Sequence, residues 1–109
     1  MQTLSRFDKT MDVVKWTRKT KPTKAELIKM MEAEGHACAL YSDTPGTKYA
    51  RHKHDFDDFL VIVSGQMKIG TDRFEWLMKP GDRLDIPANT VHWANMVGKE
   101  EVHYLSAAK

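Results

Sequence analysis

The sequence predicts an all-β domain, a barrel or sandwich of short strands preceded by one short N-terminal helix. From residue 36 on, short apolar segments alternate with Gly- and Pro-containing turns, at the spacing of roughly 8–12 residues that is typical of such folds. Residues 23–34 instead carry apolar side chains at helical spacing. The length of 109 residues fits one domain. We therefore expect residues 1–35 to form an arm and a helix that packs on the barrel, and residues 36–109 to form the barrel.

The helix has clear signals at both ends. Thr23 to Glu26 matches a capping box, in which the Thr hydroxyl and the Glu carboxylate each accept from the other residue's backbone N–H. Met30 and Met31 follow at helical spacing, and Gly35 occupies the position where a glycine commonly ends a helix. The pattern predicts a helix over residues 23–34 whose methionines pack on the barrel.

The strands are predicted from alternation and from the turns between them. The segment Phe56–Ser64 is a nearly continuous apolar run rich in β-branched residues, which indicates a strand buried on both faces. The other segments alternate and end at Gly, Pro, Asn or Asp. In chain order the expected strands are His36–Ser42, Lys48–His54, Phe56–Ser64, Gln66–Gly70, Phe74–Met78, Arg83–Ile86, Val91–Met96 and Glu101–Ser106.

The segment from Gly46 to Gly65 carries the chemistry. His52, His54 and Asp58 are all even-numbered, so on one continuous strand their side chains face the same side. A single histidine is more often a surface or hydrogen-bonded residue than a ligand. Two imidazoles and a carboxylate that converge, with His92 downstream as a fourth candidate, instead favour a divalent-metal site.

The same residues resemble the two motifs of the cupin family. Gly46–Gly65 reads G-x5-H-x-H-x3-D-x6-G and resembles the first motif, G-x5-H-x-H-x3,4-E-x6-G. Gly81–Asn95 reads G-x5-P-x-N-x2-H-x2-N and resembles the second, G-x5-P-x-G-x2-H-x3-N. The resemblance covers roughly residues 36–106. It implies a small single-domain cupin, that is, a cupin-type double-stranded β-helix or jelly-roll barrel. It also implies a ligand set of His52, His54, Asp58 and His92.

Three positions depart from the family pattern. Asp58 replaces a Glu, which places the carboxylate one methylene further back. Asn89 replaces a glycine, and Asn is the other residue that tolerates the left-handed αL conformation. Asn95 comes one position early. The shorter acid leaves two alternatives open, a four-ligand site or a three-histidine site with Asp58 outside the first shell of ligands.

The expected cofactor is one divalent transition metal, Fe, Mn, Ni or Zn, because imidazole and carboxylate ligands suit all of them. Asp58, as fourth ligand or general base, and His103, which the last strand could bring to the cavity, are the candidate catalytic residues. Apolar and aromatic side chains are expected to form the cavity walls. The candidate wall residues are Tyr41, Tyr49, Phe56, Met67, Ile69, Trp93 and Tyr104.

Two classes of function fit these observations. The resemblance implies metal-dependent chemistry on a small molecule, either dioxygenase- or oxidase-like attack on a phenol, thiol or organic acid, or isomerase- or lyase-like chemistry on a sugar-like or keto acid. The alternative is a non-catalytic cupin module that binds or senses a small ligand or a metal. The intact histidine set disfavours a third reading, a purely structural cupin without metal.

Composition argues against several partners. With 17 basic and 15 acidic residues the net charge is +2, too balanced to indicate nucleic-acid or membrane binding. The basic cluster Lys15–Lys24 is interpreted as a solvated surface, with phosphate binding as the alternative. No stretch resembles a signal peptide or a membrane span, so a cytoplasmic protein is expected. Small cupins commonly pair, and the apolar segment Val13–Trp16 is either an edge strand or an arm on a partner subunit. We expect a homodimer.

Overall fold

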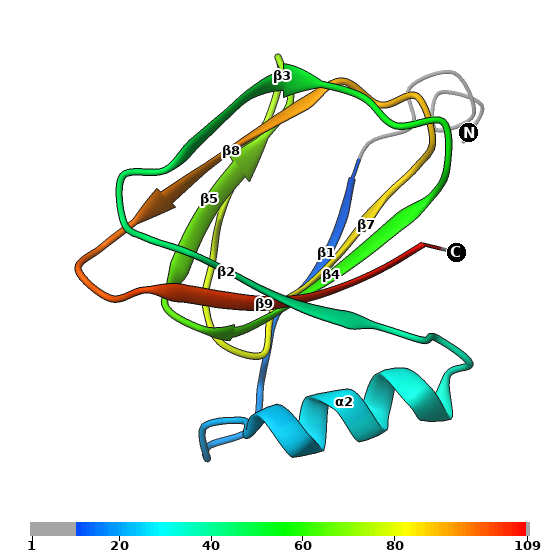
Figure 1. The fold of residues 1–109 in the computed structure, drawn as a ribbon, viewed down its shortest axis with the longest axis vertical. Coiled ribbons are helices and arrows are strands. Elements are labelled where there is room, and N and C mark those ends of the chain that lie inside the picture. The colour runs from blue at the N-terminus through cyan, green and yellow to red at the C-terminus, as the bar shows by residue number, and fades with distance from the viewer. Residues whose placement is uncertain (1–10, 109) are drawn as a thin grey trace.

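Two antiparallel sheets face each other in the computed structural model, which describes residues 11–108 (Figure 1). The five-stranded sheet has the order β1-β7-β4-β9-β2, and the four-stranded sheet has the order β3-β8-β5-β6. This confirms the all-β barrel preceded by one helix. The elements are β1 (Asp12–Val14), α2 (Lys24–Ala33), β2 (Ala39–Asp43), β3 (Lys48–His52), β4 (Asp58–Ser64), β5 (Gln66–Gly70), β6 (Glu75–Met78), β7 (Arg83–Ile86), β8 (His92–Val97) and β9 (Val102–Ala108).

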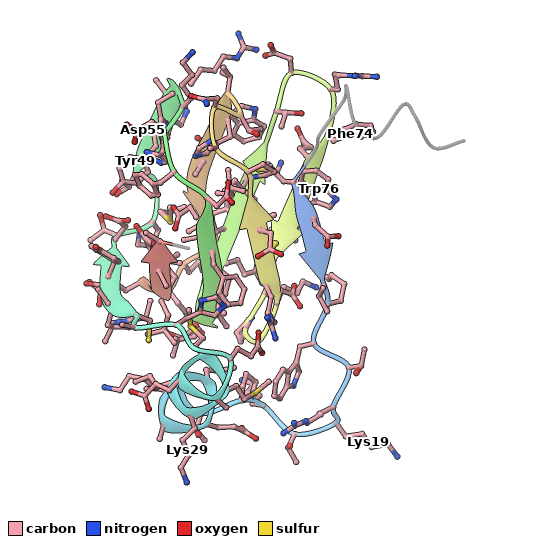
Figure 2. The ribbon with its side chains drawn as sticks, turned by 90° about the vertical axis from the view of Figure 1, so that its right-hand side faces the viewer. Lys19, Lys29, Tyr49, Asp55, Phe74 and Trp76 are labelled. Atoms are coloured by element: carbon pink, nitrogen blue, oxygen red, sulfur yellow. The ribbon has the colours of Figure 1, made fainter. Side chains whose placement is uncertain are left out.

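Helix α2 begins and ends where its sequence signals predict. The Glu26 backbone N–H donates to the Thr23 hydroxyl (3.1 Å), and the Thr23 backbone N–H donates to the Glu26 carboxylate (3.3 Å). Gly35 ends the helix with a φ of +88°, which favours glycine. In Figure 2 the helix lies below the strands and Lys29 points away from them. Among residues 11–108 there is no helix with the length and apolar character that a membrane crossing requires.

Strand β4, in the middle of the five-stranded sheet, is buried on both faces over residues 58–62, as the apolar run Phe56–Ser64 predicts. Along β4, Leu60 and Ile62 face the barrel interior, whereas Phe59 and Val61 face α2. The interior core contains Met11, Leu60, Ile62, Met67, Ile69, Met78, Leu84, Ile86, Ala94, Met96 and Val102. The core beneath the helix contains Leu27, Met31, Phe59, Val61, Leu105 and Ala107.

The segment that precedes α2 is an edge strand of the barrel within this chain. Strand β1 pairs with β7, with Val13 opposite Leu84. Directly after it, the Trp16 backbone N–H donates to the buried carboxylate of Asp82 (2.8 Å), which also pairs with Lys15. The Trp16 ring lies against Gly81, where a Cβ atom would lie 2.4 Å from the ring and the φ is +91°. A glycine at this turn therefore lets the arm close against the sheet.

Two predicted strand ends differ in a way that matters for the site. The strands Lys48–His54 and Phe56–Ser64 were expected, and the parity argument treated His52, His54 and Asp58 as lying on one continuous strand, but β3 ends at His52 and β4 begins at Asp58. Residues 53–57 form a connection between the two sheets, because β3 belongs to the four-stranded sheet and β4 to the five-stranded one. The acid and the first histidine therefore reach the barrel interior from opposite sheets.

Candidate metal centre

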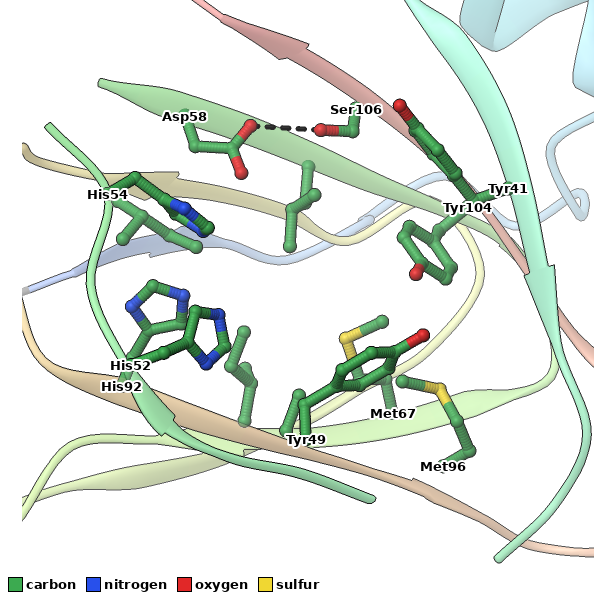
Figure 3. Close-up of a pocket in the computed structure, with 14 residues that line it drawn as sticks. Tyr41, Tyr49, His52, His54, Asp58, Met67, His92, Met96, Tyr104 and Ser106 are labelled. Atoms are coloured by element: carbon green, nitrogen blue, oxygen red, sulfur yellow. Dashed lines mark hydrogen bonds between the residues drawn. The ribbon is translucent and has the colours of Figure 1, made fainter. Parts of the chain in front are cut away.

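Three histidines meet at one end of the barrel interior. His52 ends β3, His92 begins the neighbouring strand β8, and the two are paired across the sheet. His54 comes from the connection that follows β3. Each ring offers one nitrogen, and these three atoms lie within 4.8 Å of one another. Figure 3 shows the three rings gathered on one side of the cavity.

Backbone carbonyl groups orient two of the three rings. The Nδ1 atom of His52 lies 2.7 Å from the Ala50 carbonyl oxygen, and that of His92 lies 2.8 Å from the Thr90 carbonyl oxygen. A carbonyl oxygen only accepts hydrogen bonds, so each Nδ1 must carry the proton. In the neutral imidazole, Nε2 then keeps its lone pair, which is the arrangement that metal-binding histidines show.

His54 is positioned by hydrogen bonds between the connection that follows β3 and the turn that precedes β8. The Asn89 backbone N–H donates to the His54 carbonyl oxygen (2.6 Å), and the Ala88 N–H donates to the Asp57 carboxylate (2.7 Å). Asn89 has a φ of +63°, the conformation expected from its replacement of a glycine in the second motif. The His54 ring stacks on Phe56 at 5.0 Å. The turn before β8 thus holds His54 beside His92.

His92 is held in its neutral form. Its side chain is 3% exposed. Burial lowers the pKa of His92, and the neighbouring His52 and His54 lower it further, against the opposing effects of the Thr90 carbonyl and of Asp58. Neutral imidazole is the form that binds metal ions.

Asp58 faces the histidines from the opposite sheet but does not belong to the three-histidine group. Its Oδ1 atom accepts hydrogen bonds from the Ser106 hydroxyl (2.9 Å) and from the Phe59 backbone N–H (2.8 Å). Its second oxygen points into the cavity in Figure 3. Asp58 therefore lines the site as expected, while its role as a metal ligand stays a prediction.

The histidines border a cavity of about 270 Å³, at the lower end of the size of small-molecule sites. Five of the seven expected wall residues line it: Tyr41, Tyr49, Met67, Ile69 and Tyr104. The irregular register between Tyr49 and His52 allows both side chains to face inward despite their different parity.

The structure does not bring Phe56, Trp93 or His103 to the cavity lining. Phe56 lies in the connection after β3 and is 41% exposed. Trp93 alternates with His92 on β8, so it faces outward, where its indole N–H donates to the Thr71 carbonyl oxygen (3.2 Å). His103 alternates with Tyr104 on β9, and its Nε2 lies 3.0 Å from the Glu101 carboxylate. Its expected catalytic role finds no support in this position.

Five lining residues were not expected, although period-two alternation would have found most of them. Ala94 and Met96 share the parity of His92 on β8, Leu60 shares that of Asp58 on β4, and Ser106 shares that of Tyr104 on β9. The fifth, Ile86, is paired with Asp58 across the sheet, a relation that only the sheet register reveals. All five border the cavity.

A second polar group lies at the tyrosine end of the cavity. The Tyr49 hydroxyl donates to Asp43 Oδ1 (2.9 Å), and the Tyr104 hydroxyl donates to Asp43 Oδ2 (2.8 Å). The hydrogen bond to Asp43 is the main cause that raises the pKa of Tyr49, and burial, followed by Asp43, strongly raises the pKa of Tyr104. Both phenols are therefore neutral over the physiological range.

Comparison with known proteins identifies the family. The model of the cupin domain family matches residues 39–108, more than half of the chain, so the chain belongs to the cupin family. A quercetin 2,3-dioxygenase from Bacillus subtilis (strain 168) is 36% identical over 61 residues, which are 54% of this chain and 18% of that protein. The chain thus spans less than a fifth of the length of this curated relative.

Solved structures share the fold at low sequence identity. A cupin 2 domain-containing protein from Halorhodospira halophila has a TM-score of 0.69 and 14% identity, over 94% of this chain and 79% of that one. A DMSP lyase from Ruegeria pomeroyi DSS-3 has a TM-score of 0.61 and 18% identity, over 67% and 37% respectively. At these identities the likeness establishes the barrel alone.

The donor set fits a divalent transition metal. Three imidazoles converge, two of them have Nε2 free of its proton, and a carboxylate faces them from across the cavity. Three protein nitrogens leave coordination positions for a ligand, as in catalytic metal sites. The cluster is a candidate metal site whose metal the geometry does not specify.

Proposed function

We propose that this cupin binds one divalent transition metal through His52, His54 and His92 and carries out oxygenase- or oxidase-type chemistry on a small molecule in the barrel cavity. The observation that carries the proposal is the convergence of three oriented imidazoles on an apolar cavity. The similarity to a quercetin 2,3-dioxygenase supports oxidative chemistry over isomerisation. Iron, manganese, nickel and zinc all suit the donor set.

A bound metal would act as a Lewis acid and hold a substrate oxygen beside the reacting atoms. The chain's own residues supply the rest. The carbonyl groups of Ala50 and Thr90 keep the rings of His52 and His92 oriented. Met67, Ile86 and other apolar residues exclude water from the cavity, which strengthens electrostatic interactions inside it.

Asp58 is the proposed proton acceptor of the cavity, or a fourth ligand. Ser106 and the Phe59 N–H hold one of its oxygens in place, and the other points into the cavity (Figure 3). A carboxylate fixed in this way can receive a proton from a ligand hydroxyl without rearranging. The two roles differ in whether Asp58 contacts the metal or the ligand.

A non-catalytic role, as a module that binds or senses a small ligand or a metal, is the second candidate. One observation favours it: Asp58 is the only carboxylate that lines the cavity among the described residues, and it already accepts two hydrogen bonds. Both hydrogen bonds go to Oδ1, so only one oxygen of this carboxylate is left for a ligand.

Elemental analysis of protein prepared without a histidine tag tests the metal site. We expect about one metal per chain in the wild type and none in a His52→Ala/His54→Ala variant. His36→Gln is the matched control, because His36 packs against Phe59 outside the group. Equal metal content in the wild type and the double variant would contradict the proposed site.

Oxygen uptake distinguishes the two candidate functions. Protein loaded with Fe or Mn is offered small catechols, thiols and keto acids, and both oxygen consumption and product are measured. Consumption that depends on His52 and His54 supports the enzyme. A compound that raises the melting temperature but is never consumed identifies a binding module.

We also propose that two copies of the chain associate. The edge strand β2 is exposed, with Leu40 and Tyr41 at 45% and 50% exposure, and an uncovered edge is a ready pairing site for another chain. Light scattering at micromolar concentration measures the mass, and a monomer would contradict the homodimer. The cytoplasmic location stays a prediction of the sequence.

A further inference from the structure

The tyrosine end of the cavity offers hydrogen-bond acceptors to a ligand. A phenol hydroxyl has one proton to donate, and a carboxylate can only accept. Tyr49 and Tyr104 both donate that proton to Asp43, one to each carboxylate oxygen (2.9 and 2.8 Å). Both tyrosines line the cavity, and with their protons donated to Asp43 their oxygens can direct only lone pairs toward a ligand.

Four other polar residues of the cavity, Asp58, Ser106, His52 and His92, have the same polarity. The Ser106 hydroxyl donates its proton to Asp58, and Asp58 itself accepts. The proton of the His52 ring and that of the His92 ring are directed away from the cavity centre, to backbone carbonyl groups. The lining groups whose hydrogen-bond direction is set by a neighbour are therefore acceptors or metal ligands. The two ends of the cavity differ in charge. A metal ion at the histidines would be positive, and the Asp43 carboxylate behind the tyrosines is negative.

We propose that the cavity selects a small molecule with a metal-chelating oxygen group at one end and a hydrogen-bond donor, a hydroxyl or an ammonium, at the other. Asp43 is the positioning residue that sets this selectivity through Tyr49 and Tyr104. The inference rests on the proposed function, because the chelating end requires the metal.

An anionic end group is disfavoured by the same arrangement. A carboxylate or phosphate placed at the tyrosines would meet two oxygens without available protons, and behind them the charge of Asp43. Neither its lone pairs nor its charge would be compensated by these two oxygens. The polarity of the site therefore separates ligands that have the same chelating group but different ends.

Asp43 also joins three strands, so a structural role must be separated from selectivity. It ends β2, and its carboxylate binds Tyr49 on β3 and Tyr104 on β9. Loss of a merely structural clamp would weaken all ligands alike. Loss of the hydrogen-bond acceptors at the tyrosine end would change the ratio of the affinities for ligands with different end groups.

Binding of three matched catechols to Zn²⁺-loaded protein tests the selectivity. Zinc avoids oxidation, and the probes carry an aminomethyl, a hydroxymethyl or a carboxylate group opposite the chelating hydroxyls. In the wild type we expect the aminomethyl and hydroxymethyl probes to bind about tenfold more tightly than the carboxylate probe. In Asp43→Asn the amide N–H donates to one tyrosine oxygen, and the proton of that tyrosine then turns to the cavity. The ratio of the affinities for the donor probes and the carboxylate probe should therefore fall to near one.

Asp72→Asn is the matched control, because Asp72 is an exposed partner of Arg51 at a hairpin, and its ratio should equal that of the wild type. Equal affinity of the wild type for all three probes, or an unchanged ratio in Asp43→Asn, would overturn the inference. The His52→Ala/His54→Ala variant should bind none of the probes. If it kept both the affinity and the ratio, the tyrosine-end selectivity would stand while the proposed metal chelation failed.

Ultraviolet titration of the tyrosines tests the proton arrangement without metal. The chain has three tyrosines, and Asp43 raises the pKa of two of them. Asp43→Asn should therefore move tyrosinate absorbance to lower pH than in the wild type, and Tyr49→Phe should identify which part belongs to Tyr104. An identical titration in the wild type and Asp43→Asn would overturn the role of Asp43.

Discussion

The two faces of the five-stranded sheet are built from alternate residues of the same strands, yet they differ in chemistry. On the helix side, Phe59, Val61 and Leu105 are 1–2% exposed and belong to the packed core beneath α2. On the cavity side, Tyr104 and Ser106 of β9 donate hydrogen bonds to carboxylates and border an open space. The two faces therefore contribute differently: the helix side contributes burial, whereas the cavity side combines burial with groups that stay available to a ligand at some cost in stability.

The largest effect is expected on the helix side. Phe59→Ala should lower the free energy of unfolding by about 3–5 kcal/mol, because a fully buried ring leaves a cavity between α2 and the sheet. Urea unfolding measures this, with the 47%-exposed Phe74→Ala as the control that changes stability little. Metal content of the folded fraction should not change. A loss of unfolding free energy below 1 kcal/mol, or a loss of metal, would contradict the distinction between the two faces.

The next effect belongs to the cavity side and requires metal. Free metal at about 100 times its dissociation constant should stabilise the wild type by about 2.7 kcal/mol. His92→Gln should abolish this stabilisation, because His92 supplies one of the three converging nitrogens. Thermal unfolding with zinc and with chelator compares the two proteins. Equal stabilisation of both would remove His92 from the site.

A smaller effect should separate the two tyrosines. Tyr104→Phe removes a hydrogen bond to Asp43 at the half-buried end of the cavity and should cost about 1 kcal/mol. Tyr49→Phe removes the equivalent bond from a residue that is 39% exposed, and should cost less because water can replace the lost partner. Denaturant unfolding of the two variants provides the comparison. A larger loss in Tyr49→Phe than in Tyr104→Phe would mean that the hydrogen bond of Tyr49 contributes more to stability.

The smallest effect is a dependence on alkaline pH. Burial and Asp43 raise the pKa of Tyr104 above the ordinary value of 10.0, so the folded protein holds this proton more tightly than the unfolded chain. Stability from this source is complete below pH 10 and is lost as the pH rises above it. Between pH 9 and 10.5, the wild type should lose a few tenths of a kcal/mol more than Tyr104→Phe. Parallel melting curves for the two proteins would refute this linkage.

Local patterns predicted much of the fold and part of the site. The capping box of Thr23 and Glu26, the αL conformation of Asn89 and the two-sided burial of β4 depend on neighbours along the chain or on hydrophobic periodicity, and all are found in the structure. The parity argument does not apply beyond the ends of the strands. It treated His52 and Asp58 as if they lay on one strand, but a connection of residues 53–57 intervenes.

Strand periodicity and helix caps, which are short-range properties of the chain, were enough to predict an all-β barrel and its helix, and the two motifs added the family and the histidines. The approach of Asp58 from the opposite sheet and the hydrogen bonds of Tyr49 and Tyr104 to Asp43 became visible only in the folded structure. These relations depend on which strands pair and in which register. Strand pairing brings together residues far apart in the chain, and the pattern of one strand alone does not tell which strand becomes its neighbour.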